Sequence, residues 1–201
     1  MSAGPGLSPH PVEVPTGYPR EYERDVRLRD GRLAFVRPII PSDAAALGTA
    51  FQGADADTLR RRFLGAPPSP TPSLLARLTT VDYRLRFALV AATESGHGIG
   101  LARYEALGDG RAEAAVVVDP RWRRVGLATA LIEILAQAAV DRGVDTFTAT
   151  YLAENRPITA LVNLAGDTGT RLIRQGIADV AVHLDRERIA AARDAARDPD
   201  G

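Results

Sequence analysis

The segment from Arg111 to Leu131 contains the residues of this sequence best suited to chemistry. A strand-like run of small apolar residues leads into an arginine-rich turn, and a helical pattern starts after Gly126. The first N–H groups of a helix lack partners and the helix dipole adds positive potential, so the turn predicts an anion site suited to a pyrophosphate. A helix start with a solvated basic face fits the same pattern. The residues that would form the anion site are Arg121, Arg123, Arg124, Gly126, Ala128 and Thr129.

Residue types exclude several other chemistries. The 201 residues include no cysteine, which removes disulfides, thiolate metal sites and a cysteine nucleophile. The three histidines, at positions 10, 97 and 183, have no ligand spacing, so we expect no metal site. The sequence holds 25 basic and 25 acidic residues, and this zero net charge gives no general attraction to nucleic acid or membrane surfaces. Because no signal peptide or membrane span is recognisable, we expect a cytoplasmic protein.

Periodicity and turn signals predict the elements that position these residues. We expect a flexible arm over residues 1–20, one domain over 21–185 and a C-terminal tail over 186–201. Within the domain, the order predicts a three-layer α/β fold whose mixed, mostly antiparallel sheet is flanked by helices. The expected elements are a hairpin or two short strands over 22–38, helices over 44–51, 57–63 and 73–79, strands over 86–92, 98–105 and 112–118, a helix from 127 to about 142, a strand over 146–152, a helix over 157–164, and a closing hairpin with strands at 171–173 and 178–184.

Two motifs resemble those of the GNAT superfamily of acyl-CoA N-acyltransferases. The stretch Arg123-Arg-Val-Gly126-Leu-Ala128 is similar to the family's acetyl-CoA loop, Gln/Arg-x-x-Gly-x-Gly/Ala. The stretch Ala153-Glu-Asn-Arg-Pro157 is similar to a second motif, whose asparagine contacts the coenzyme. Further similarity to bacterial protein lysine acetyltransferase domains covers roughly residues 18–184. The segments that carry it include Tyr18-Pro19, Asp25-Val-Arg-Leu-Arg-Asp-Gly, Arg62-Phe63, Ala102-Arg-Tyr104 and Ala112-Glu-Ala-Ala-Val-Val-Val.

The resemblance implies a GNAT fold with acetyl-CoA as cosubstrate. In that fold two neighbouring strands diverge, and the pantetheine arm pairs with exposed strand backbone. Here that strand would be 112–118, with a backbone N–H near Val116 or Val118 holding the thioester carbonyl. The residues expected to bind the coenzyme are Val116, Val117, Val118, Arg123, Arg124, Val125, Gly126, Leu127, Ala128, Thr129 and Asn155.

Glu113 is the candidate general base. A carboxylate within a run of alanine and valine should be desolvated, which favours proton uptake from an ammonium ion near neutral pH. The resemblance supports this role, because the lysine acetyltransferase subgroup places its base at the matching glutamate. The alternative is a glutamate at the wet end of the strand, paired with Arg103 or Arg111.

The general acid is not evident from the motifs. Many family members have a tyrosine seven residues after the asparagine, where this sequence has Val162. Tyr104 and Tyr151 could reach the site from neighbouring strands, although buried tyrosines are more often core residues. A second departure is Asp167, where the family usually has an aromatic residue. The run from Arg60 to Arg62 could attract an acidic acceptor, or form a solvated helix face.

These patterns predict transfer of an acetyl or short acyl group from acyl-CoA directly to an amine, with a protein lysine as the leading acceptor. A small-molecule amine acetyltransferase is the first alternative. A non-catalytic acyl-CoA-binding module is the second. We expect a monomer or homodimer.

Overall fold

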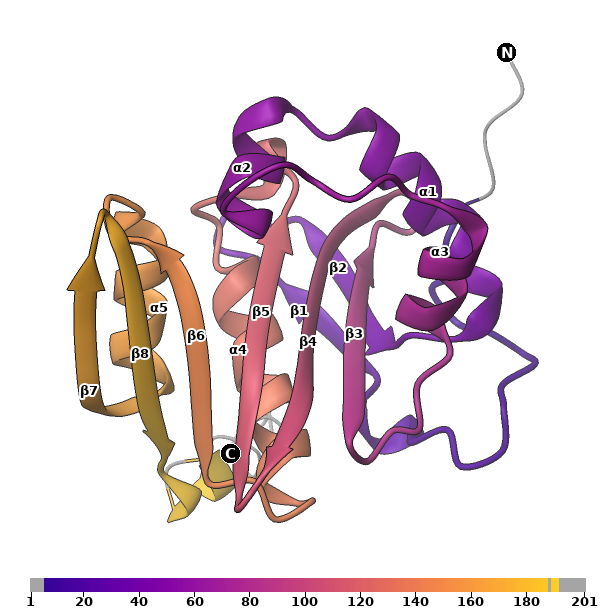
Figure 1. The fold of residues 1–201 in the computed structure, drawn as a ribbon. Coiled ribbons are helices and arrows are strands. Elements are labelled where there is room, and N and C mark those ends of the chain that lie inside the picture. The colour runs from indigo at the N-terminus through magenta and orange to yellow at the C-terminus, as the bar shows by residue number, and fades with distance from the viewer. Residues whose placement is uncertain (1–5, 188, 192–201) are drawn as a thin grey trace.

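A computed structural model of the chain describes residues 6–187 and 189–191 (Figure 1). It contains one sheet of eight strands in the order β1-β2-β3-β4-β5-β6-β8-β7. All neighbouring strands are antiparallel except β5 and β6, which are parallel. The strands are β1 (Arg24–Arg27), β2 (Leu33–Pro38), β3 (Arg86–Ala92), β4 (Gly98–Gly108), β5 (Arg111–Val118), β6 (Thr146–Leu152), β7 (Gly166–Arg174) and β8 (Ile177–Leu184).

Helices cover both faces of this sheet, which confirms the expected layers (Figure 1). One face packs against α4 (Leu127–Val140) and α5 (Arg156–Ala165). The other face lies beneath α1 (Ala44–Gly53), α2 (Ala56–Phe63) and α3 (Pro72–Thr79). Short 3-10 turns occupy Arg20–Tyr22, Pro41–Asp43 and Pro120–Trp122.

The main core lies between α4 and the centre of the sheet. Leu127, Leu131 and Leu135 recur at helical spacing and are at most 1% exposed, so α4 presents a continuous apolar stripe. This stripe packs against Phe87 and Tyr104, whose rings stack 5.8 Å apart. Burial of each large side chain contributes about 1.5–3 kcal/mol. The core therefore fixes the start of α4 relative to β4 and β5.

The N-terminal segment packs more closely than its composition indicates. Leu7 is 6% exposed, and its N–H donates to the backbone oxygen of Gly96 at 2.8 Å. The guanidinium of the buried Arg37 donates to the backbone oxygen of Ser8 at 2.6 Å. The expectation of a flexible arm is therefore wrong for these residues, because contacts distant in sequence hold them on the domain.

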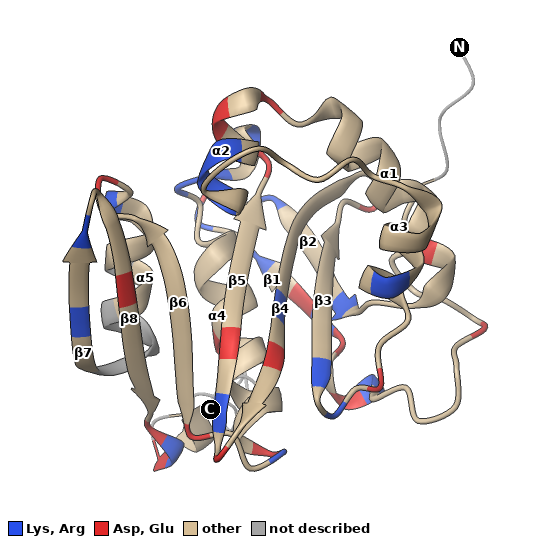
Figure 2. Cartoon of the chain, viewed as in Figure 1, with Lys and Arg blue, Asp and Glu red and all other residues tan. Residues whose placement is uncertain are grey.

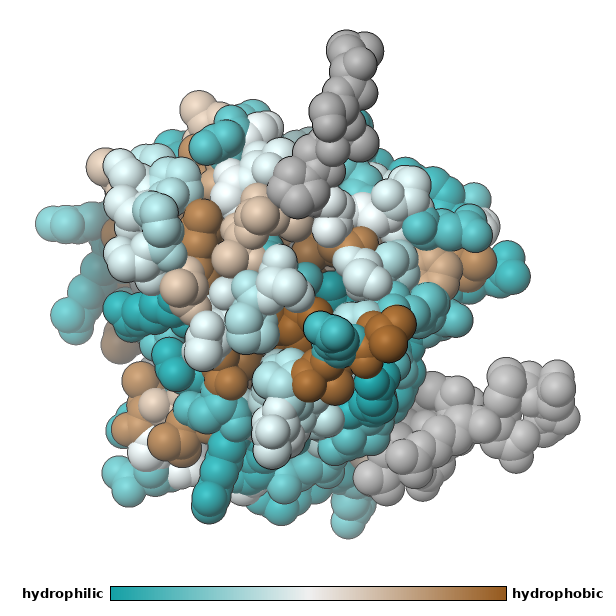
Figure 3. All heavy atoms as spheres, turned by 90° about the vertical axis from the view of Figure 1, so that its right-hand side faces the viewer, coloured by the Kyte–Doolittle hydropathy of each residue, from teal (hydrophilic) through white to brown (hydrophobic). Residues whose placement is uncertain are grey.

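On the face that carries α1 and α3, apolar side chains form small groups separated by hydrophilic ones (Figure 3). No helix among the described residues is long and apolar enough to cross a membrane.

Candidate active site

Strands β5 and β6 are paired only at one end. Their register joins Arg111 to Thr146 and ends where Glu113 meets Thr148. Beyond that rung β5 remains paired with β4, and β6 with β8, but β5 and β6 separate from each other (Figure 1). We call residues 114–118 and 149–152 the diverging segments. Alternate backbone groups on each point away from the paired neighbour, so a ligand entering between the segments meets free N–H and C=O groups.

The start of α4 provides a second set of free donors. Gly126 is the N-cap residue, with φ +95° and ψ −7°, and no side chain caps this end. The first intrahelical bond is donated by the N–H of Ala130 to the oxygen of Gly126 at 3.1 Å. The N–H groups of Leu127, Ala128 and Thr129 therefore precede the helical ladder and have no acceptor within it. Together with the helix dipole they suit a diphosphate.

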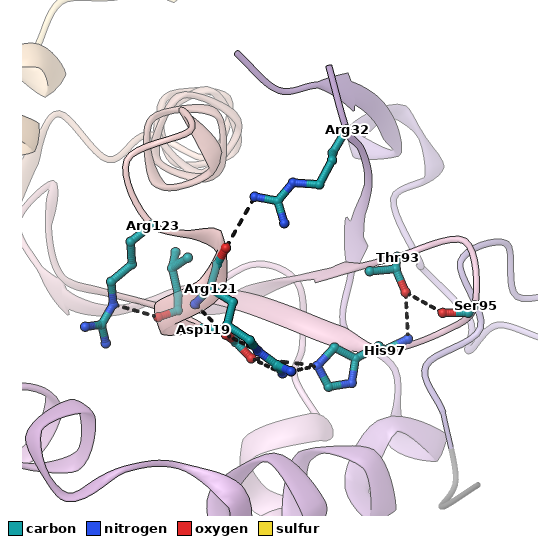
Figure 4. Close-up of polar contacts among 8 residues, drawn as sticks. Arg32, Thr93, Ser95, His97, Asp119, Arg121 and Arg123 are labelled. Atoms are coloured by element: carbon teal, nitrogen blue, oxygen red, sulfur yellow. Dashed lines mark hydrogen bonds and ion pairs between the residues drawn. The ribbon is translucent and has the colours of Figure 1, made fainter. Parts of the chain in front are cut away.

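Neighbouring elements hold the loop between β5 and α4 in place (Figure 4). The Asp119 carboxylate accepts bonds from the backbone and side chain of Arg121, and this pairing lowers the pKa of Asp119. Arg121 also contacts the His97 ring, with Nη2 and Nε2 3.0 Å apart. From the β1–β2 hairpin, Arg32 donates to the oxygen of Arg121 at 3.3 Å and stacks on Trp122. Trp122 is thus a packing residue of the loop.

Arg123 links the loop to α2. Its Nε donates to the oxygen of Val118 at 3.2 Å, and its Nη2 donates to the hydroxyl of Thr58 at 2.7 Å. Thr58 in turn bonds Asp55, the N-cap of α2. Sequence reasoning missed Thr58 because no local signal connects α2 to a loop 65 residues away. Arg124 is exposed, as Arg123 is, but it has φ +64°.

Asn155 lies at the same end of the sheet. It follows β6, as the loop follows β5, and parallel strands end at the same edge. Asn155 is 7% exposed, and its side-chain amide makes no hydrogen bond among the residues that the structure describes. The amide atoms retain some contact with solvent, so they are free to bond a ligand. The structure thus brings Asn155, the α4 start and the diverging segments to one end of β5 and β6.

Glu113 lies on the opposite face from α4. Ala112 is buried in the core, so strand alternation turns Glu113 outward, where its side chain is exposed. The burial expected from its apolar sequence neighbours is therefore wrong. Within the described residues its carboxylate makes no hydrogen bond or ion pair, because Arg103 instead bonds Glu105. Glu105 is directly opposite Glu113 on β4, and Figure 2 shows acidic positions side by side on these strands.

The basic helix α2 lies near this face. Arg60 and Arg61 form ion pairs with Glu154 and Asp57, at 2.9 and 2.6 Å. Arg62 instead is partly buried, with its guanidinium 5.1 Å from the centre of the Phe63 ring, and desolvation by burial lowers its pKa. It makes no hydrogen bond or ion pair in the described part of the chain, although Glu113 favours its charge.

Comparison with known proteins identifies this arrangement. The model of the acetyltransferase (GNAT) family matches residues 56–164, just over half of the chain. The chain belongs to this family. Among solved structures, the GNAT domain of S. lividans PAT matches with a TM-score of 0.73 and 31% identity, covering 83% of this chain and 99% of that one.

Two other relatives extend the comparison. Acetyltransferase Pat of Mycolicibacterium smegmatis is 28% identical over 183 residues, and the match covers 86% of this chain. The chain spans about half, 54%, of that protein's length. At the level of fold alone, a phosphinothricin acetyltransferase from Sinorhizobium meliloti in complex with AcCoA matches with a TM-score of 0.61 at 19% identity, covering 75% of this chain and 88% of that one. The chain thus has the fold and the family signature of GNAT acetyltransferases.

The structure explains only some of the positions at which this sequence differs from the usual GNAT residues. Val162 is buried beside Tyr151, so α5 offers no hydroxyl at that position. Tyr104 is fully buried and donates to the oxygen of Arg84 at 3.0 Å, which makes it a core residue. Asp167 is on β7, and its side chain is not among those that the structure describes. No cluster of potential metal ligands occurs among the residues described.

Proposed function

We propose that this protein transfers an acetyl group from acetyl-CoA to the side-chain amine of a protein lysine, with Glu113 as general base. The lysine acceptor is supported by the similarity to the PAT domain over nearly its whole length. The base is supported by one observation above all: Glu113 is on the last rung before β5 and β6 diverge, and its carboxylate is unpaired within the described residues.

The proposed coenzyme contacts follow from the free backbone groups. The α4 start binds the diphosphate, aided by Arg124, while Arg123 positions the loop through Val118 and Thr58. The diverging segment of β5 pairs with the pantetheine arm, and Asn155 satisfies its amide on the same ligand. A β5 N–H near Val116 or Val118 stabilises the negative charge that develops on the thioester oxygen.

The amine must lose a proton to attack the carbonyl carbon. Glu113 accepts this proton, the new C–N bond forms, and the C–S electrons leave on sulfur. Direct transfer needs no covalent enzyme intermediate, which agrees with a sequence that has no cysteine.

The test is a Glu113→Gln variant assayed with isotopically labelled acetyl-CoA and lysine peptides. Loss of a general base should lower turnover about 10²–10⁴-fold at neutral pH. Affinity for acetyl-CoA should not change. The matched control is Glu105→Gln, which alters the same residue type directly opposite on β4 but leaves the proposed base. A Glu113→Gln variant with nearly unchanged kcat/KM would remove Glu113 from the mechanism.

Arg62 favours a second acceptor class. A half-buried guanidinium that has no hydrogen-bonded partner in the described chain, near the proposed base, suits an amine that also carries a carboxylate. A small amino acid has this chemistry. Parallel assays of lysine peptides and free amino acids distinguish the two, because an Arg62→Met variant should lose activity selectively on the carboxylated amine.

A further inference from the structure

One buried hydroxyl near the diverging segments has no partner. Tyr151 on β6 is 4% exposed, and its hydroxyl makes no hydrogen bond to any residue that the structure describes. In the described part of the chain, the only other buried side-chain polar atom without a hydrogen bond is the hydroxyl of Tyr18, whose ring packs against Tyr83. By contrast, the hydroxyls of Tyr22, Tyr83 and Tyr104 bond Asp141, the oxygen of Ile39 and the oxygen of Arg84, at 2.6, 2.8 and 3.0 Å.

Tyr151 belongs to a buried hydrophobic cluster. The other buried members are Val162 of α5 and Ala178, Val180 and Val182 of β8. None of these side chains can accept or donate a hydrogen bond. A buried hydroxyl in such surroundings is destabilising, and such an orphan group calls for an explanation.

The sheet register places Tyr151 across from the proposed thioester. Paired residues on β5 and β6 differ by 35 in number, as in Glu113 and Thr148. Continued at that offset, Tyr151 is level with Val116, one of the two positions proposed to hold the carbonyl. Ala112 and its partner Phe147 share the α4 face, and alternation puts Val116 and Tyr151 on that face as well.

A ligand arm between the diverging segments would occupy the place of a missing strand. Adjacent strands are about 4.8 Å apart, so this arm would have β5 on one side and β6 at a similar distance on the other. The thioester sulfur is bonded directly to the carbonyl carbon held by β5. A side chain of β6 level with Val116 is therefore the group placed to meet that sulfur.

We infer that the Tyr151 hydroxyl is the group that stabilises the departing coenzyme sulfur. This inference rests on the proposed placement of acetyl-CoA. When the C–S bond breaks, its electron pair stays on sulfur, and the Tyr151 O–H donates a hydrogen bond to the thiolate. The amine proton goes to Glu113, and the thiolate takes a proton from solvent after release. Tyr151 thereby supplies the hydroxyl that many family members have at the position of Val162.

A Tyr151→Phe variant tests this role without an activity assay. Calorimetry compares the affinity for coenzyme A with that for desulfo-coenzyme A, which lacks the sulfur. At a pH where the coenzyme thiol is ionised, we expect the wild-type protein to prefer coenzyme A and the variant to lose about tenfold of this preference, since hydrogen bonds to charged groups are the strong ones. In turnover assays kcat should fall at least as much, with KM for the amine unchanged. The melting temperature should stay level or rise, because no protein hydrogen bond is lost.

Tyr104→Phe is the matched control. It removes a buried hydroxyl on neighbouring β4 that already bonds Arg84, so it should lower stability but leave the sulfur preference intact. If Tyr151→Phe leaves the sulfur preference unchanged, the inference is overturned, whatever happens to kcat. If the wild-type protein does not bind coenzyme A, the proposed coenzyme placement fails and the inference fails with it.

Discussion

The left-handed backbone at Gly126 leads to a prediction with two separable parts. An alanine at this position must adopt φ near +95°, where an L-residue is strained. In the left-handed region this costs about 1–2 kcal/mol. Apart from its two chain neighbours, the atom nearest to the added Cβ would be a side-chain carbon of Arg29 at 3.7 Å. Gly126→Ala should therefore fold with backbone strain but without a steric clash.

Thermal melting measures the first part. In a domain of this size, each 1 kcal/mol shifts Tm by about 2–4 °C, so Gly126→Ala should lower Tm by about 2–8 °C. The control is Gly53→Ala at the end of α1, where φ is ordinary and no atom lies within 4 Å of the new Cβ. That change should be neutral or stabilise by up to about 1 kcal/mol.

Coenzyme affinity measures the second part. Because the Cβ of Gly126→Ala meets no protein atom at close range, any steric effect falls on the bound diphosphate. We expect KM for acetyl-CoA to rise about tenfold, equivalent to about 1.4 kcal/mol, with KM for the amine unchanged. A variant as stable as Gly53→Ala would refute the strain argument. An unchanged KM for acetyl-CoA would show that the α4 start does not bind the coenzyme.

Three further changes test other parts of the structure. Asp43→Ala leaves the buried Arg37 guanidinium without its two 2.8 Å hydrogen bonds. It should lower the free energy of unfolding, measured in urea, by about 3–5 kcal/mol. Burial raises the pKa of Tyr22 to about 12, and its bond to Asp141 adds to the shift. The stability that the Tyr22 hydroxyl contributes to the folded state is therefore complete below pH about 10 and is lost as the pH rises to about 12. Tyr22→Phe should therefore flatten the alkaline fall in Tm. Asn155→Ala should weaken acetyl-CoA binding about tenfold in calorimetry without lowering Tm, since no described residue bonds its amide.

Most elements could be predicted because their signals are local. The bounds of β3 and β6 agree with the sequence prediction, since both are short apolar runs between turn residues. The loop over residues 65–71 contains no helix, as its prolines require. The expected hairpin over 22–38 turns at Asp30-Gly31, with Gly31 at φ +84° and Asp30 bonded to the N–H of Arg32.

Other features depend on pairing between distant segments. The sequence predicted the last hairpin from residue 171, but β7 begins at Gly166 because β8 pairs with it there, from Leu184 onward. Burial of Leu7 depends likewise on the distant turn at Gly96. The exposure of Glu113 depends on which face of β5 meets α4, and a strand with small residues on both faces does not encode that choice.

The parallel pair at the centre of the sheet explains why the candidate site lies where it does. A parallel connection must cross over through a helix, and α4 therefore starts at the carboxyl end of β5. Divergence at this same end places free strand groups beside free helix donors. Glu113 precedes Val116 by three residues, about 10 Å along the strand, which leaves room for an acceptor amine and a bridging water. A single topological choice thus sets the proposed diphosphate site, the proposed thioester position and the proposed base in line along β5.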